Sequence, residues 1–104
     1  MDERDFARHA DAAFAHIEAV LEAADEDVEF ELAPGGVLEI VFANGSKMVI
    51  NRHAIAREIW VAAKSGGFHF RWNGEDWVDT RSGEPLMAAL TRLVQAQAGL
   101  ALAF

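Results

Sequence analysis

A chain of 104 residues has room for one domain, so we expect residues 1–104 to form a single folding unit. About half of its residues are apolar and a quarter are charged, as in a globular protein, and no apolar run approaches the roughly 20 residues of a membrane span. The lack of cysteine excludes disulfides and thiolate chemistry, and the net charge of −8 is opposite to that of a nucleic-acid-binding protein.

The first predicted element is an amphipathic helix over about residues 2–24. Its apolar residues recur at spacings of three and four, and no glycine or proline interrupts it. The acidic start of the chain, residues 1–5, resembles neither a secretory signal nor a transit peptide, so we expect a cytoplasmic protein.

From residue 27 the apolar period changes to two, which indicates strands. We expect strands at residues 27–32, 37–43, 46–51, 55–64, 68–73 and 76–79, with glycine-containing turns at 34–36, 44–45, 65–67 and 73–74. A second helix is predicted at residues 84–97 with Ser82 as its N-cap, and an apolar tail at residues 100–104 should pack between the helices. This order predicts an α+β two-layer sandwich, with both helices on one face of a five- to six-stranded, mostly antiparallel sheet.

The excess of negative charge lies in residues 1–31, which contain eleven acidic residues and two arginines. On a helical wheel three acids of the first helix fall within roughly 40° of each other, opposite the apolar stripe. Further acids at the helix end and at alternate positions of the first strand would extend this stripe. We call this set the acidic ridge, and it comprises Asp11, Glu18, Glu22, Asp25, Asp27, Glu29 and Glu31.

Two interpretations of the acidic ridge remain open. It is either a solvated face that keeps the protein soluble, or a set of weak, shallow oxygen sites for hard cations. The ridge has no interleaved lysine with which to form stabilising helical ion pairs. Glu3, in the first turn of the helix, is a further candidate ligand, whereas the four histidines show no metal-ligand spacing.

Trp60 lies in the predicted fourth strand, and its orientation depends on the register. If Ile59 and Val61 face the helices, Trp60 stands on the uncovered face together with Glu58 and is a candidate anchor for a protein partner. In the other register Trp60 belongs to the core. We expect no enzymatic activity, because the serines lie in turns without a partnered histidine and no phosphate loop is present.

Several ordered motifs resemble the frataxin family, in particular its bacterial, CyaY-type branch. They are Asn44-Gly45-Ser46-Lys47 with Ile50-Asn51-Arg52, then Ile59-Trp60, and then Gly66-Gly67-Phe68-His69-Phe70. The resemblance runs through essentially the whole chain and implies the same helix–sheet–helix fold.

The resemblance further implies an iron-binding protein of iron–sulfur cluster assembly. Such a protein binds ferrous and ferric iron at the acidic ridge, has no organic cofactor, and docks on a cysteine desulfurase and its scaffold protein. By position, the family's partner surface on the sheet corresponds to Trp60, Asn51 and Arg52. Glu18 and Glu22 of the ridge are also expected to contact the partner. We expect a monomer that iron can drive into oligomers.

The chain departs from the family pattern between the Asn-Arg pair and the tryptophan. His53, Ile55 and Glu58 stand where the family usually has glutamine, proline and glutamine, so the sheet surface is altered. A second function therefore stays open, an acidic interaction module that modulates a basic enzyme and binds iron only incidentally.

Overall fold

The computed structural model describes residues 1–104. Helix α1 spans Glu3–Ala24, a 3-10 turn η1 follows at Asp25–Asp27, and helix α2 spans Leu86–Ala98. The strands are β1 (Val28–Ala33), β2 (Val37–Phe42), β3 (Lys47–His53), β4 (Glu58–Ala63), β5 (Gly66–Trp72) and β6 (Trp77–Asp79). The predicted order of one helix, five or six strands and one helix is confirmed, with six strands present.

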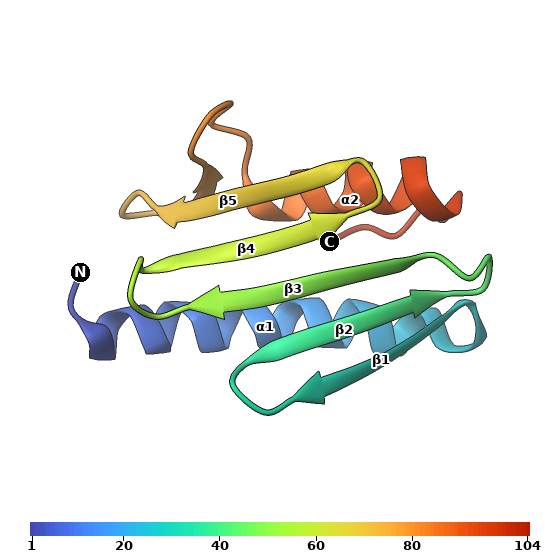
Figure 1. The fold of residues 1–104 in the computed structure, drawn as a ribbon, viewed down its shortest axis with the longest axis horizontal. Helices are drawn as coiled ribbons and strands as arrows, with labels where there is room; N and C mark the ends of the chain where they lie inside the picture. Colours follow the sequence, from blue (N-terminus) through green and yellow to red (C-terminus); the bar gives the residue numbers. More distant parts are fainter.

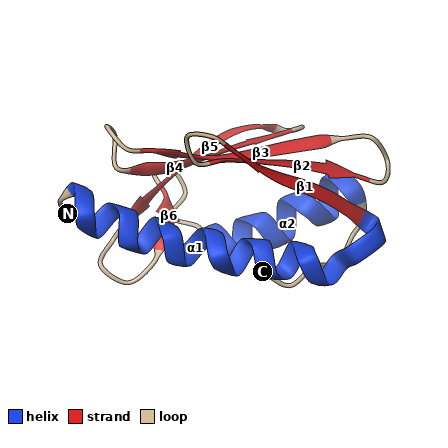
Figure 2. Ribbon diagram, turned by 90° about the horizontal axis from the view of Figure 1, so that it is seen from below, coloured by secondary structure: helices blue, strands red, loops and turns tan.

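The strands form one sheet in which each strand pairs antiparallel with its neighbour in sequence, from β1 at one edge to β6 at the other. The sheet is seen face-on in Figure 1. Figure 2 shows it edge-on, with α1 and α2 side by side beneath the same face. The other face carries no helix. The predicted two-layer α+β sandwich is therefore confirmed.

The core lies between the helices and the sheet because each element buries one face. Helix α1 buries the stripe that its sequence period predicts, which is Phe6, Ala10, Ala13, Phe14, Ile17 and Leu21. Alternate residues of the sheet face this stripe, among them Ile40, Ile50, Ile59, Val61 and Phe70, each at most 1% exposed. Buried apolar area of this kind is the main favourable term in folding.

The start of α2 differs from the prediction. Ser82 does not cap the helix, because its Oγ accepts a hydrogen bond from the Glu84 N–H within the preceding turn, at 3.2 Å. Pro85 forms a β-bridge with Val78 and keeps an extended backbone, so the helix begins only at Leu86. At the other end Gly99 adopts the left-handed conformation and terminates the helix.

Strand β4 also begins later than predicted. Residues 54–57 form a turn in which Arg57 has a positive φ of 57°, and pairing with β3 starts only at Glu58. The apolar tail does pack between the helices. The Phe104 N–H donates to Thr91 Oγ1 of α2 at 3.1 Å, and the Phe104 carbonyl oxygen lies 2.7 Å from His16 Nε2 of α1. No helix is both long and apolar enough to cross a membrane.

Phe70 is fully buried in β5 between the layers, whereas Phe68 lies two residues away on the same face and is only half-buried. We expect Phe70→Ala to lower the free energy of unfolding by about 3–5 kcal/mol, because it leaves a cavity in the centre of the core. The matched Phe68→Ala variant should lose clearly less in the same urea titration. Equal losses would contradict this placement of the core.

Candidate functional site

The acidic ridge follows the outer side of α1 and continues into β1. Glu22 is exposed, whereas Glu18 is half-buried at the edge of the apolar stripe that packs on the sheet. The short turn η1 then carries Asp25 and Asp27 to the sheet edge, where Glu29 and Glu31 point away from the helices. Only η1 separates the end of α1 from β1 (Figure 1). These carboxylates therefore follow one another as one series of negative charges along the chain.

The carboxylates between residues 18 and 31 have no basic partner. None of them takes part in an ion pair or accepts a side-chain hydrogen bond. After Arg8 the next lysine or arginine in the sequence is Lys47. Like charges held on neighbouring turns repel each other, so this part of the surface favours a bound cation or a basic partner.

Sequence reasoning missed one further member of this charged surface, Glu39 of β2. The β1–β2 register places Glu39 directly opposite Glu31, and both point to the uncovered face of the sheet. Together with Glu29 they line a hollow of about 250 Å³. The sequence does contain a signal for this pairing. The turn at residues 34–36 separates two strands of clear alternation, and a hairpin turn fixes which residues of its two strands lie opposite each other.

Not every predicted ligand joins this charged surface. Glu3 lies nineteen residues before Glu22 on the same helix, which is about 28 Å at 1.5 Å per residue. Asp11 is engaged by Arg52, whose Nη1 lies 2.6 Å from its Oδ1. The structure contains no group of three or more His, Asp or Glu side chains that could hold a metal ion together. The ridge therefore offers single or paired carboxylates rather than a closed cage.

The uncovered face of the sheet carries a second feature, an aromatic stack centred on Trp60. His53 of β3 stacks on one side of the indole at 4.0 Å between ring centroids, and His69 of β5 on the other at 4.5 Å. The register places Asn51 and His69 directly beside Trp60 on the neighbouring strands. We call Asn51, His53, Trp60 and His69 the sheet patch.

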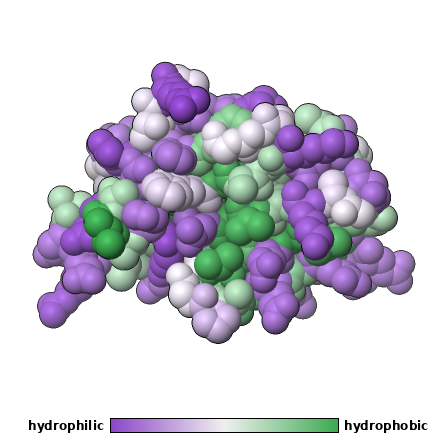
Figure 3. All heavy atoms as spheres, in the orientation of Figure 1, coloured by the Kyte–Doolittle hydropathy of each residue, from purple (hydrophilic) through white to green (hydrophobic).

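Ile59 and Val61 face the helices and are buried, so Trp60 does stand on the uncovered face. The imidazoles cover both faces of its ring, so Trp60 is half-buried rather than widely exposed. Around the patch the face is mixed, with a hydrophobic band between hydrophilic side chains (Figure 3). A hollow of about 230 Å³ opens beside Trp60 where small Ala62 and Gly67 pair across the strands.

Glu58 lies two residues before Trp60 on the same face of β4 and holds the sheet patch in place. Its side chain is only 7% exposed, and it accepts hydrogen bonds from Trp60 Nε1 at 2.8 Å and from Arg71 Nη2 at 2.6 Å. Burial raises the pKa of Glu58, but these hydrogen bonds and the positive charge of Arg71 outweigh it, so that the pKa lies below its ordinary value. The ionised carboxylate thereby fixes the indole in its position.

The structure corrects the assignment of Arg52 to this surface. Arg52 pairs with buried Ile59 in the β3–β4 register, so its side chain points to the helices, opposite to Asn51 and Trp60. Alternation along a strand is strict, and neighbours such as Asn51 and Arg52 must face opposite sides. Arg52 instead lies over the Phe14 ring of α1 and reaches Asp11.

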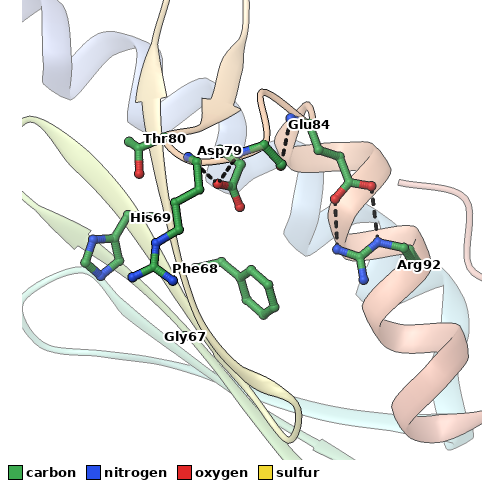
Figure 4. A pocket seen from close by; sticks show the side chains of 9 residues that line it. Gly67, Phe68, His69, Asp79, Thr80, Glu84 and Arg92 are labelled. Atoms are coloured by element: carbon green, nitrogen blue, oxygen red, sulfur yellow. Dashed lines mark hydrogen bonds and ion pairs between the residues drawn. The ribbon is translucent and has the colours of Figure 1, made fainter.

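A further hollow, of about 430 Å³, lies between β5, the loop after β6 and α2 (Figure 4). Glu84 accepts two hydrogen bonds from Arg92, and these bonds with the negative charges of Glu84 and Asp79 hold the pKa of Arg92 above its ordinary value, although burial lowers it. Asp79 accepts hydrogen bonds from the backbone N–H groups of the turn that follows it. These carboxylates stabilise the loop, and no predicted site residue lines the hollow.

Fold and surface together define a class, a small helix–sheet–helix sandwich with an acidic helix and an uncovered, aromatic sheet face. A family model described as a frataxin-like domain matches residues 1–100. The chain belongs to the frataxin family, and its curated relatives place it in the CyaY-type branch.

Two of these relatives are named iron–sulfur cluster assembly protein CyaY. The protein of Dechloromonas aromatica is 58% identical over 102 residues, covering 98% of this chain and 97% of its own length. That of Cupriavidus taiwanensis is 50% identical over 97 residues, covering 93% and 86%.

Solved structures show the same fold. Frataxin from Psychromonas ingrahamii superposes with a TM-score of 0.88 at 27% identity, covering 98% of this chain and 96% of that one. Trimeric frataxin from Saccharomyces cerevisiae, complexed with ferrous iron, superposes with a TM-score of 0.74 at 28% identity, covering 88% and 87%.

The pKa of Glu58 predicts how its contribution to stability depends on pH. A carboxyl whose pKa is lowered on folding stabilises the protein above its ordinary pKa of 4.5, and this contribution is lost as the pH falls through the lowered value. We expect Glu58→Gln to reduce the free energy of unfolding by about 1 kcal/mol at pH 7. The difference in free energy of unfolding between the wild type and Glu58→Gln should shrink as the pH is lowered. A difference that stays constant from pH 7 to pH 3 in urea titrations would contradict the charged role.

Proposed function

We propose that this protein binds iron as a cargo at its acidic ridge and acts in iron–sulfur cluster assembly. The observation that carries the proposal is the run of carboxylates from Glu18 to Glu31 without a single basic partner. Carboxylate oxygens are hard donors and suit exposed, exchangeable binding of Fe²⁺ and Fe³⁺. The names of the bacterial relatives and the ferrous complex of the yeast homologue support the same role.

The geometry favours weak binding to several positions over one tight site. The ridge carboxylates are solvent-exposed apart from half-buried Glu18, and water screens their attraction to an ion. Glu18 and Glu22, one helical turn apart, can supply two carboxylate groups, and the coordination sphere would be completed by water. Such sites release iron readily, which suits a donor or regulator and does not suit a storage protein.

We further propose that the protein is a non-catalytic partner of the cysteine desulfurase and its scaffold protein. The ridge, with Glu18 and Glu22 at its centre, is complementary to a basic protein surface. The sheet patch offers a second contact, with Trp60 as its aromatic anchor and Asn51 beside it. Arg52 is excluded from this second contact because it faces the helices. We expect a monomer in the absence of iron, with oligomers forming only when iron neutralises the ridge.

One observation favours the second function, an interaction module to which iron binding is incidental. No three potential ligands lie close enough to share an ion. Desulfurase affinity measured with and without ferrous iron separates the two functions. An iron donor or iron-dependent regulator should bind differently in the two conditions, whereas a pure interaction module should bind equally well.

The ridge itself is tested by Glu18→Gln combined with Glu22→Gln. We expect this double variant to bind ferrous iron and desulfurase more weakly, because it removes two of the unneutralised carboxylates. Its thermal stability should stay unchanged or rise slightly, because an i,i+4 repulsion of a few tenths of a kcal/mol disappears. Isothermal titration at low and moderate ionic strength measures the binding, and melting curves measure the stability.

The matched control for this experiment is Glu75→Gln combined with Asp76→Gln in the turn before β6. These exposed acids change the net charge equally but lie outside the ridge. The control should bind like the wild type. If both double variants weaken binding alike, net charge rather than the ridge is responsible. A ridge variant that melts clearly lower yet binds normally would show that Glu18 and Glu22 are structural.

Trp60→Ala tests the sheet patch. We expect affinity for the assembly complex to fall by more than about 1 kcal/mol, as on truncation of an interface anchor. The free energy of unfolding should fall by less than the roughly 3–5 kcal/mol typical of a core aromatic residue. Surface plasmon resonance and urea titration measure the two effects. Unchanged affinity of the folded variant would remove Trp60 from the partner surface.

A further inference from the structure

The ion pair between Arg52 and Asp11 joins strand β3 to helix α1. It is the one ion pair that engages a member of the acidic ridge, and its Nη1–Oδ1 distance is 2.6 Å. The Asp11 side chain is 69% exposed, whereas that of Arg52 is 23% exposed. A carboxylate open to solvent is thus held by a largely buried cation.

The position of Arg52 is fixed on several sides. Its guanidinium carbon lies 4.6 Å from the centre of the Phe14 ring, within the range of a cation–π contact. Its Nε is buried without a hydrogen-bond partner. Gly36 of the β1–β2 turn passes so close that a Cβ there would lie 2.6 Å from Arg52 Cγ. Arg52 cannot easily swing away, so its charge stays beside Asp11.

Asp11 is also separated from the rest of the ridge. Glu18 follows it by seven residues, about 10 Å along the helix, and the position one turn after Asp11 is Ala15. One ion cannot be shared over that distance. A cation at Asp11 would therefore meet a single carboxylate and, next to it, the positive charge of Arg52.

We infer that Arg52 is the internal counter-cation of Asp11 and restricts exchangeable cation binding on the ridge to Glu18 and the residues that follow it. This inference rests on the proposed function, because it assumes that the ridge binds metal. It makes Arg52 a specificity-determining residue that acts from the helix-facing side of the sheet. Its removal should expose a new weak cation site at Asp11.

The test compares Arg52→Gln with Arg81→Gln, using Mn²⁺ as a redox-stable probe in the full-length protein. Both variants make the net charge more negative by one, but Arg81 is exposed, forms no ion pair and lies in the loop after β6. Paramagnetic broadening of backbone amide signals, fitted jointly to ion positions at Asp11 and at Glu18, separates the occupancies of these two positions. For Arg52→Gln we expect broadening at residues 10–12 at Mn²⁺ concentrations at least about fivefold lower than in the wild type. Arg81→Gln should behave like the wild type at these residues.

A third variant, Arg52→Gln combined with Asp11→Asn, should lose the new broadening while broadening at Glu18 and Glu22 persists. Amide spectra of each variant verify that the fold is retained. If Arg52→Gln does not fold, Arg52→Met is used in its place, because the methionine side chain can still pack on Phe14.

The inference is overturned if Arg52→Gln leaves residues 10–12 unchanged, or if the wild type already binds Mn²⁺ there as well as at Glu18. In either case the proposed function stands as long as Glu18 and Glu22 are broadened. No broadening anywhere on the ridge of the wild type would overturn both.

Discussion

Packing of the apolar stripe of α1 on the sheet is the constraint on which the rest of the structure depends. Burial of residues such as Phe14 and Ile17 fixes the rotation of the helix about its axis. Glu22 is then turned to solvent, and Glu18 lies at the edge of the interface. Because η1 is a single turn, β1 follows at once and adds Glu29 and Glu31 to the same negatively charged side. Charge and hydrophobic burial are two consequences of one amphipathic helix.

The sheet separates two kinds of surface because both helices cover the same face. Its uncovered face is organised by pairs across the strands, so Trp60 acquires neighbours that are distant in the sequence. A buried carboxylate on this face is unusual and requires compensation. Glu58 is compensated by the indole N–H of Trp60 and by the guanidinium of Arg71. The burial of Ile59 and Val61 thus places the tryptophan on this face, and polar contacts and the stacked imidazoles hold its ring there.

The sequence by itself determined the fold class and most of its elements. The spacing in α1, the alternation in the strands and the glycine turns gave the two-layer sandwich, since local periods reflect the face that each element buries. The sequence also showed that the acids are concentrated in the first third of the chain. Together with the family resemblance, it placed Trp60 on the uncovered face. The start of α2 could not be predicted from the sequence, because the β-bridge between Val78 and Pro85 overrides the capping preference of Ser82.

Only the tertiary structure decided which side chains meet. The engagement of Asp11 by Arg52 joins residues 41 apart in sequence, and no pattern in α1 or β3 alone signals it. The same holds for Glu39 opposite Glu31 and for the two histidines that enclose Trp60. Arg52 was assigned to the wrong face because motif neighbours were grouped together, although adjacent strand residues point to opposite sides. Periodicity determines which face a residue occupies, but strand register and helix docking determine its neighbours, and both arise from long-range packing.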